Sequence, residues 1–291
     1  MLFQSIEELL ELTKKYGTIA EVMIQTEIKT SQYPREIILE HMSKNLSVMM
    51  ASIKKGVAGV TSVTGLTGGD AKRMDHYLEN SNYLSGTTIL KAVRNAVAVN
   101  EVNAEMGLIC ATPTAGSAGV AAGVLSAMVE DYDISHEEQL NFLFTAGAIG
   151  LVIANKASIS GAAGGCQAEI GSASAMASGA LVILRGGTPQ QAAQAVAMTI
   201  ANMLGLICDP VAGLVEVPCV KRNALGASQA FISADMALAG INSVIPVDEV
   251  IETMHQVGMQ MPSIFKETAE GGLAATKTGK EIMHRLYQNN K

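Results

Sequence analysis

Apolar residues recur along the chain at the three- and four-residue spacing of amphipathic helices. The first helix is expected after Ser5, which can form a capping box with Glu8, and it should end at Gly17. A second helix is expected from Pro34 to Gly56. Its apolar stripe consists of Ile38, Met42, Leu46, Met49 and Ile53.

A second capping box and a Pro-containing start mark two later helices. Ser135 with Glu138 should open an apolar helix that runs to Ala154, and Thr188, Pro189 and Gln191 should open one that runs to about Met203. Helical periodicity also predicts helices near 87–106, 118–130, 170–184, 223–239, 248–258 and 279–289. No alternating pattern longer than a few residues indicates a strand. The fold class is therefore predicted to be all-α, as a single compact Ala/Gly-rich multi-helix domain over residues 1–291.

Four connections rich in Gly, Ser and Thr interrupt the helices. They are Thr61–Asp70, Cys110–Gly119, Ser158–Glu169 and Gly205–Asn223. A single Gly-rich loop is usually only a break between elements. Two of these four hold three of the four cysteines, so the loops are candidates for the walls of an active site.

Composition and charge argue against several classes of protein. Of the 291 residues 48% are hydrophobic and 16% charged, with no Trp, so small aliphatic side chains must fill the core. The net charge of −7 argues against nucleic-acid or anionic-membrane partners. The most apolar stretch, Phe142–Ala154, is too short to span a bilayer, and the N-terminus lacks the pattern of an export signal. We therefore expect a cytoplasmic protein with free thiols.

Three cysteines suggest a metal site without proving one. Cys166, Cys208 and Cys219 each lie in or beside a Gly- or Pro-containing turn, with polar and charged neighbours. A closed structural site usually has four protein ligands, whereas a catalytic metal keeps one position open. A cluster held by three thiolates would leave one iron free as a Lewis acid. The alternative, that all three are buried structural thiols, stays open from the residues alone.

Long motifs give the chain a family resemblance. The runs ASISGAAGGCQAEIGSASAMAS (157–178), GLICDPVAGLVEVPCVKRNALGAS (205–228) and ATPTAGSAG (111–119) resemble signatures of the iron–sulfur L-serine dehydratases, in the form that has separate α and β chains. The likeness extends to VTGLTGGDAKRM (63–74), AVNEVNAEMG (98–107) and KETAEGGLAAT (266–276), and so covers nearly the whole chain.

This resemblance implies a function and a cofactor. The expected reaction converts L-serine to pyruvate and ammonia, with a 4Fe-4S cluster bound by Cys166, Cys208 and Cys219. The single-chain relatives carry a regulatory domain and a cysteine-bearing tail, whereas this chain ends HRLYQNNK. A separate β subunit is therefore the expected partner. Cys110 does not match a ligand position and is interpreted as a buried thiol.

The reaction also needs a base and an anchor for the substrate carboxylate. Arg222, Asn223, Thr114 and Ser117 are the candidates for substrate binding, because guanidinium, amide and hydroxyl groups bind carboxylates. Arg222 could instead form a structural ion pair, and Asn223 could be a helix cap. Glu169, Lys72, Ser158 and Ser160 are the candidate bases, and no one of them is preferred. The five histidines lie outside the motifs and are expected to be surface or packing residues.

Two other interpretations compete with this one. A non-catalytic, metal-stabilised helical interaction protein would explain the Ala/Gly-rich helices but not the length of the motifs. A pyridoxal-phosphate dehydratase would need a Schiff-base lysine, for which Lys156 is the candidate. The absence of predicted parallel strands argues against that enzyme class.

Overall fold

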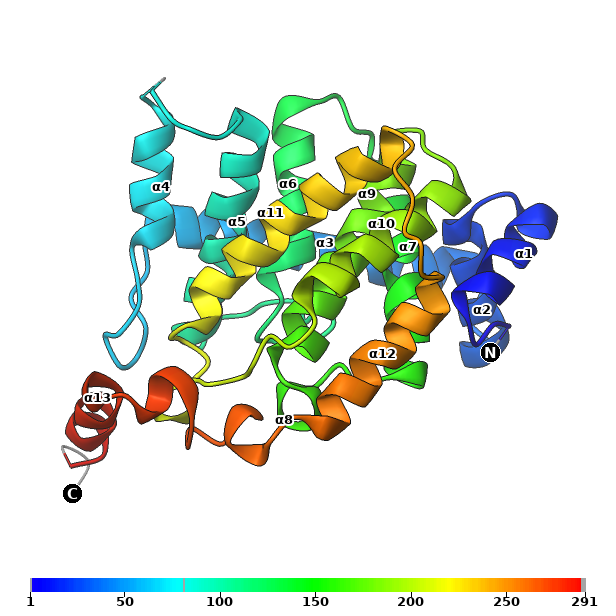
Figure 1. The fold of residues 1–291 in the computed structure, drawn as a ribbon. Coiled ribbons are helices and arrows are strands. Elements are labelled where there is room, and N and C mark those ends of the chain that lie inside the picture. Colours follow the sequence, from blue (N-terminus) through cyan, green and yellow to red (C-terminus); the bar gives the residue numbers. More distant parts are fainter. Residues whose placement is uncertain (1, 81, 289–291) are drawn as a thin grey trace.

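The protein is helical throughout the part of the chain that is described. The computed structural model describes residues 2–80 and 82–288, which contain thirteen α-helices and no strand (Figure 1). The α-helices are α1 (Ile6–Tyr16), α2 (Ile19–Ser31), α3 (Arg35–Ala58), α4 (Asp70–Leu78), α5 (Thr87–Ala104), α6 (Gly119–Asp131), α7 (His136–Lys156), α8 (Gly161–Gly164), α9 (Ser172–Leu184), α10 (Pro189–Met203), α11 (Cys219–Leu238), α12 (Val247–Gln260) and α13 (Lys277–Gln288). A π-helical turn, η1 (Gln167–Gly171), leads into α9. Three short 3-10 helices complete the set: η2 (Val211–Gly213), η3 (Ser263–Phe265) and η4 (Gly272–Ala275). The all-α prediction is confirmed.

Local capping explains where several helices begin. The box predicted at Ser135 is complete, and the helix start predicted at Thr188 also has a complete box. In each, the N-cap side chain accepts from the N3 amide, and the N3 side chain accepts from the N-cap amide. The predicted box at Ser5 is only half formed. The Ser5 hydroxyl accepts from the Glu8 amide, but the Glu8 carboxylate accepts from the Gln4 amide instead of from Ser5.

Three features of the helices differ from the sequence prediction. Helix α2, capped by Thr18, and helix α4 were not predicted: the buried residues of α2 fall at nearly consecutive positions instead of a helical stripe, and α4 buries only Ala71. Helix α11 begins at Cys219 instead of 223, so the cysteine lies in a first helical turn and not in a loop. The last predicted helix is found as α13, although its expected final residue, 289, lies outside the described residues.

Small residues let the central helices pack closely. A methyl group added at Gly119 of α6 would overlap the carbonyl oxygen of Ala96 on α5, and one added at Gly123 would lie 2.7 Å from the Ala92 oxygen. Helix α9 is buried along almost its whole length, surrounded by α6, α7, α10 and α11. An Ala/Gly-rich sequence is therefore what allows these backbones to approach one another.

The apolar core extends from α1 to α12. Most of its buried apolar side chains form one connected cluster, and α7, predicted to be a core helix, contributes much of it. A smaller cluster lies where α4, α5 and α11 meet and consists of Ala71, Val97, Ala98 and Val220. Within the described residues, no helix combines the length and the apolar character needed to cross a membrane.

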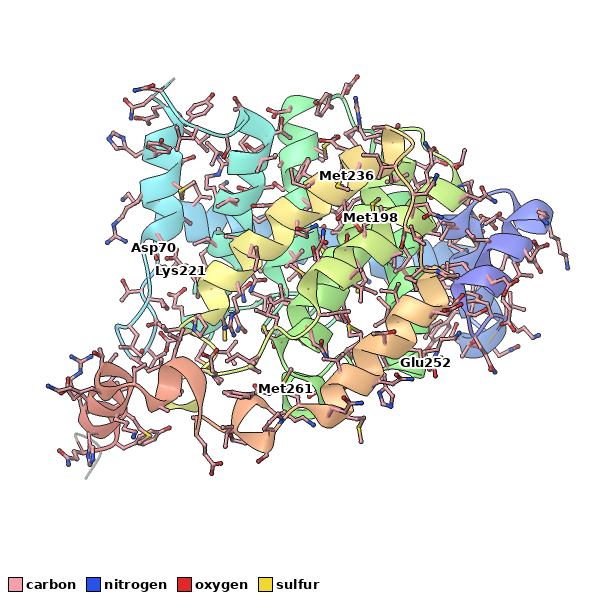
Figure 2. The ribbon with its side chains drawn as sticks, viewed as in Figure 1. Asp70, Met198, Lys221, Met236, Glu252 and Met261 are labelled. Atoms are coloured by element: carbon pink, nitrogen blue, oxygen red, sulfur yellow. The ribbon has the colours of Figure 1, made fainter. Side chains whose placement is uncertain are left out.

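The arrangement of the helices brings distant loops to one edge of the molecule. Helix α11 crosses the bundle diagonally, and its first turn lies at the same edge as α8 and the segment leading to α13 (Figure 1). Near this edge Lys221 of α11 forms an ion pair with Asp70, the first residue of α4, at 2.7 Å (Figure 2). The Gly-rich connections of the sequence therefore meet in space.

Replacing Gly119 by Ala should destabilise the protein, because the added methyl group has no space beside the α5 backbone. We expect the free energy of unfolding to fall by about 1–3 kcal/mol in urea titrations. Gly147→Ala is the matched control, since nothing lies within 4 Å of its added methyl group. Equal unfolding midpoints for the two variants would contradict the close α5–α6 contact.

Candidate active site

Three of the four cysteines come from three different segments and lie together at the edge of the molecule that holds α8 and the first turn of α11. Cys166 immediately precedes η1, Cys208 lies in the loop after α10, and Cys219 is the first residue of α11. All three side chains are buried, and none forms a disulfide. The spacing of these cysteines in the sequence did not predict that they lie close together. They do so because α9 packs against α11.

The thiols interact electrostatically with one another. A hydrogen bond from the Cys208 thiol lowers the pKa of Cys166, and the charge of Arg222 lowers it further. The same hydrogen bond, together with burial, raises the pKa of Cys208. Burial raises the pKa of Cys219 to about 12, and the neighbouring negative charges of Cys166 and Glu169 add to the effect. The Arg222 charge and the Cys208 thiol therefore both favour the thiolate form of Cys166.

Arg222 is the cation of this cluster. Its Nη2 lies 2.8 Å from Oδ1 of the buried Asp209, and its Nη1 donates to the Ile207 carbonyl oxygen at 2.8 Å. Asp209 in turn accepts from the Leu273 amide at 2.7 Å. The ion pair therefore joins α11, the Cys208 loop and η4. Arg222 therefore forms the structural ion pair that the sequence left open as an alternative role. The guanidinium also lies beside Cys166.

The candidate base Glu169 meets the predicted substrate-binding loop. The Thr114 hydroxyl donates to Glu169 Oε1 and lies 2.9 Å from the Ser117 hydroxyl. Burial raises the pKa of the Glu169 carboxyl, the hydrogen bond from Thr114 opposes this, and the negative charge of Glu267 adds to it. The structure therefore brings Glu169, Thr114 and Ser117 together, although they are distant in sequence.

Asn223 holds the turn that carries these hydroxyl groups. Its Nδ2 donates to the carbonyl oxygens of Gly116 and Cys219, and its Oδ1 accepts from the Gly119 amide at 3.1 Å. Asn100 makes the same pair of contacts to Gly116 and Gly119 from α5. Since both donors of the Asn223 amide are used on the backbone, this side chain fixes the loop between Thr114 and α6.

Glu267 is a site residue that the sequence analysis did not single out. Its amide donates to the Cys208 carbonyl oxygen at 2.9 Å, and the Cys208 amide donates to Phe265 at 2.8 Å. Its φ of 63° is uncommon for a residue other than Gly. A methyl group added at Gly161 would lie 2.9 Å from Cys208 Sγ, 3.3 Å from Glu169 Oε2 and 3.4 Å from Glu267 Oε2. Gly161 thus marks the point where the thiol and both carboxylates meet. The only sequence signal for Glu267 was its place in the run KETAEGGLAAT.

The other candidate bases lie in different surroundings. Ser160 immediately precedes Gly161, and its amide donates to the Ser158 hydroxyl at 3.0 Å. Ser158 lines a small separate cavity with Met254 and His255 of α12. The exposed Lys72 lies on α4, with its Cδ 3.1 Å from the position of an added methyl group at Gly59.

Lys156, Cys110 and the five histidines were also assigned roles from the sequence. Lys156, the candidate Schiff-base lysine, forms an ion pair with Asp248 at 3.0 Å. Cys110 is only partly buried, which corrects the expectation of a buried thiol, and burial raises its pKa. All five histidines are exposed, as expected: His41, His76, His136, His255 and His284.

Comparison with known proteins places this helical, cysteine-centred chain in a family. Residues 14–274 match the serine dehydratase alpha chain family. The probable L-serine dehydratase alpha chain of Bacillus subtilis is 58% identical over 98% of this chain and 96% of its own length. The L-serine dehydratase alpha chain of Peptoniphilus asaccharolyticus is 43% identical over 97% of each chain. L-serine dehydratase 1 of Escherichia coli is 35% identical over 94% of this chain but only 61% of its own. The chain therefore belongs to the serine dehydratase alpha chain family.

Gly161→Ala should disturb the site without unfolding the protein, because its methyl group would press on Cys208 Sγ and the two carboxylates. We expect the rate of Cys208 modification by a thiol reagent to change at least severalfold under native conditions, as read by mass spectrometry. Gly171→Ala is the control, since its added methyl group meets nothing closer than 3.6 Å. Identical labelling of Cys208 in both variants would show that Gly161 is not in contact with the thiol.

Proposed function

We propose that the chain is the catalytic α subunit of an L-serine dehydratase, a lyase that converts L-serine to pyruvate and ammonia. The observation that carries the proposal is the convergence of three buried free cysteines with the Thr114–Glu169 pair at one edge of the fold. Family membership and the names of the relatives support the reaction and the substrate.

The residues of the site suit a 4Fe-4S cluster held by Cys166, Cys208 and Cys219. Within residues 2–80 and 82–288, no three His, Cys, Asp or Glu side chains surround a position for a single metal ion. Thiols that each bind a different iron of a cluster do not need to meet at one point. The negative charges of Cys166 and Glu267 oppose ionisation of Cys208 and Cys219, so a cationic iron core would favour their thiolate forms. When bound, such a cluster supplies a Lewis-acidic iron for the substrate hydroxyl.

The protein groups would orient the substrate and move its proton. Glu169 is our choice of base, because its carboxylate lies next to the Cys208 thiol across Gly161 and is held by Thr114. A half-buried carboxyl with a raised pKa takes up a proton more readily than one in water. Lys72, Ser158 and Ser160 lack this combination of contacts. Ser117 and the backbone of its loop, fixed by Asn100 and Asn223, would present donors to the substrate carboxylate.

Arg222 would act on the substrate from a fixed position. Its ion pair with Asp209 and its bond to Ile207 restrain the guanidinium, and the remaining charge faces the cysteine cluster. A restrained cation attracts a carboxylate without losing further side-chain entropy. Arg222 could therefore bind the substrate carboxylate, as predicted, while it keeps its ion pair with Asp209.

A separate β chain is the proposed partner, in the cytoplasm. The Bacillus and Peptoniphilus relatives are named alpha chains, which implies a second chain. The Escherichia coli relative is longer, and this chain spans 61% of it. The four free thiols suit a reducing compartment.

Replacing any one of Cys166, Cys208 or Cys219 by Ser should remove both the cluster and serine turnover. We expect the parent protein, purified without air and with its β chain, to contain roughly four iron and four acid-labile sulfide per α chain. Cys110→Ser is the matched control and should keep both. Zinc without sulfide in the parent protein would instead favour a metal-stabilised interaction protein.

Glu169→Gln should lower kcat by about 10²–10⁴-fold while iron and sulfide content stays unchanged, because the amide cannot accept the α-proton. Exchange of the serine α-hydrogen with deuterated water should fall in parallel. Glu270→Gln is the control, since Glu270 is exposed in the same segment as Glu267. Full activity of the Glu169 variant, with loss of activity in Ser160→Ala, would transfer the role of base to Ser160.

A further inference from the structure

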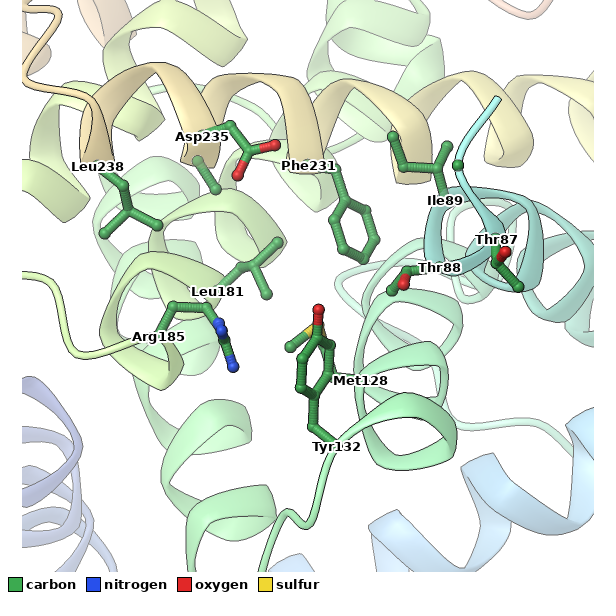
Figure 3. Close-up of a pocket in the computed structure, with 12 residues that line it drawn as sticks. Thr87, Thr88, Ile89, Met128, Tyr132, Leu181, Arg185, Phe231, Asp235 and Leu238 are labelled. Carbon is green, nitrogen blue, oxygen red and sulfur yellow. The ribbon is translucent and has the colours of Figure 1, made fainter. Parts of the chain in front are cut away.

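A cavity of about 310 Å³ lies at the C-terminal ends of α9 and α11, at the opposite ends of these helices from Cys166 and Cys219. Figure 3 shows the side chains that line it. It is formed by the start of α5, the end of α6, the end of α9 and the second half of α11. Met128, Leu181 and Phe231 form an apolar wall, with side chains that are 2%, 3% and 8% exposed, and Thr87 and Thr88 line the side formed by α5. This volume is at the lower end of the range of small-molecule sites, roughly 300–1,000 Å³.

Two opposite charges stand at the mouth of this cavity. Arg185 follows the last residue of α9, and Asp235 lies on α11. Leu181 lies between them in the view of Figure 3. No ion pair within residues 2–80 and 82–288 involves either side chain, although both line the same cavity. The two charges are therefore too far apart to neutralise each other directly, and both are exposed to a ligand.

The guanidinium is held in place while its donors stay free. The Arg185 Cζ lies 4.4 Å from the centroid of the Tyr132 ring. This cation–π contact restrains the guanidinium, and no side-chain hydrogen bond within residues 2–80 and 82–288 uses its N–H groups. The planar fork can then bind a carboxylate through two hydrogen bonds. Tyr132 is itself 42% exposed, so this group stands at the open rim.

We propose that the cavity binds a free α-amino acid with an apolar side chain. The carboxylate would bind Arg185, the ammonium group would bind Asp235, and the side chain would lie on Phe231, Leu181 and Met128. This places one cation, one anion and an apolar tail against groups of matching chemistry. L-Serine should bind more weakly, because its short side chain buries little apolar area against Phe231, Leu181 and Met128.

The site is separate from the proposed catalytic centre but uses the same helices. Cys219 and Asp235 are sixteen residues apart on α11, which corresponds to about 24 Å along a helix. Leu181 and Arg185 lie at the far end of α9 from η1 and Cys166. A ligand in this cavity would therefore bridge the C-terminal ends of α11, which begins at Cys219, and of α9, which follows η1 and Cys166.

Isothermal titration calorimetry of the full chain with L-leucine tests the proposal. We expect saturable binding that weakens at least tenfold in Arg185→Gln and in Asp235→Asn. The two analogues 4-methylpentanoate and 3-methylbutylamine, which lack the amine and the carboxylate, should also bind at least tenfold more weakly. Glycine should bind at least about tenfold more weakly than L-leucine, because it lacks the apolar side chain. Arg285→Gln, on the exposed face of α13, is the control and should bind as the parent does.

Specific outcomes overturn the assignment. Both cavity variants should keep the parent circular dichroism spectrum, since neither side chain is in the core. L-Leucine affinity unchanged in both variants would place the ligand elsewhere. The proposal also fails if L-leucine, L-methionine and L-valine give no binding at about 10 mM. The measurement needs neither cluster nor turnover, so its result is independent of the proposed dehydratase activity.

Discussion

Close contact between helix backbones is the constraint on which the site depends. Gly119 and Gly123 bring α6 against α5, and Gly226 of α11 faces Val120 and Ile170, where a methyl group would lie 2.9–3.0 Å from their side chains. These contacts position the first turn of α11 beside η1. If larger residues separated the helices, Cys219 would move away from Cys166. The Ala/Gly-rich composition is therefore a condition for the site as well as for the core.

The ion pair between Arg222 and Asp209 is the second interaction on which the site depends. The partly buried Arg222 is the cation that neutralises Asp209 and faces Cys166, and the ion pair joins α11 to the Cys208 loop and to η4. Removing either partner would leave an uncompensated buried charge, which is much more costly than losing a surface ion pair. The same residues that stabilise the loops therefore set the electrostatic environment of the thiols.

The sequence predicted some parts of the structure better than others. Long helices with capping residues, such as α7 and α10, were predicted with nearly correct ends, because their starts depend on neighbouring residues. Helices α2 and α4 were missed, since tertiary packing stabilises them more than their own pattern does. The three cysteines and Glu169 were recognised from motifs, whereas Glu267 was not. Its proximity to Cys208 depends on two backbone hydrogen bonds between segments almost sixty residues apart.

By itself, the sequence determined the helical class and the small-residue core, and it supplied the three cysteines that we propose as cluster ligands. These follow from local periodicity, side-chain volume and donor type. Only the tertiary structure decided that Thr114 binds Glu169, that Asn223 is committed to backbone groups, and that Arg222 pairs with Asp209. It also brought Arg185 and Asp235 to one cavity. The physical reason is that such pairings depend on where helices end in space, and packing between distant segments fixes those positions.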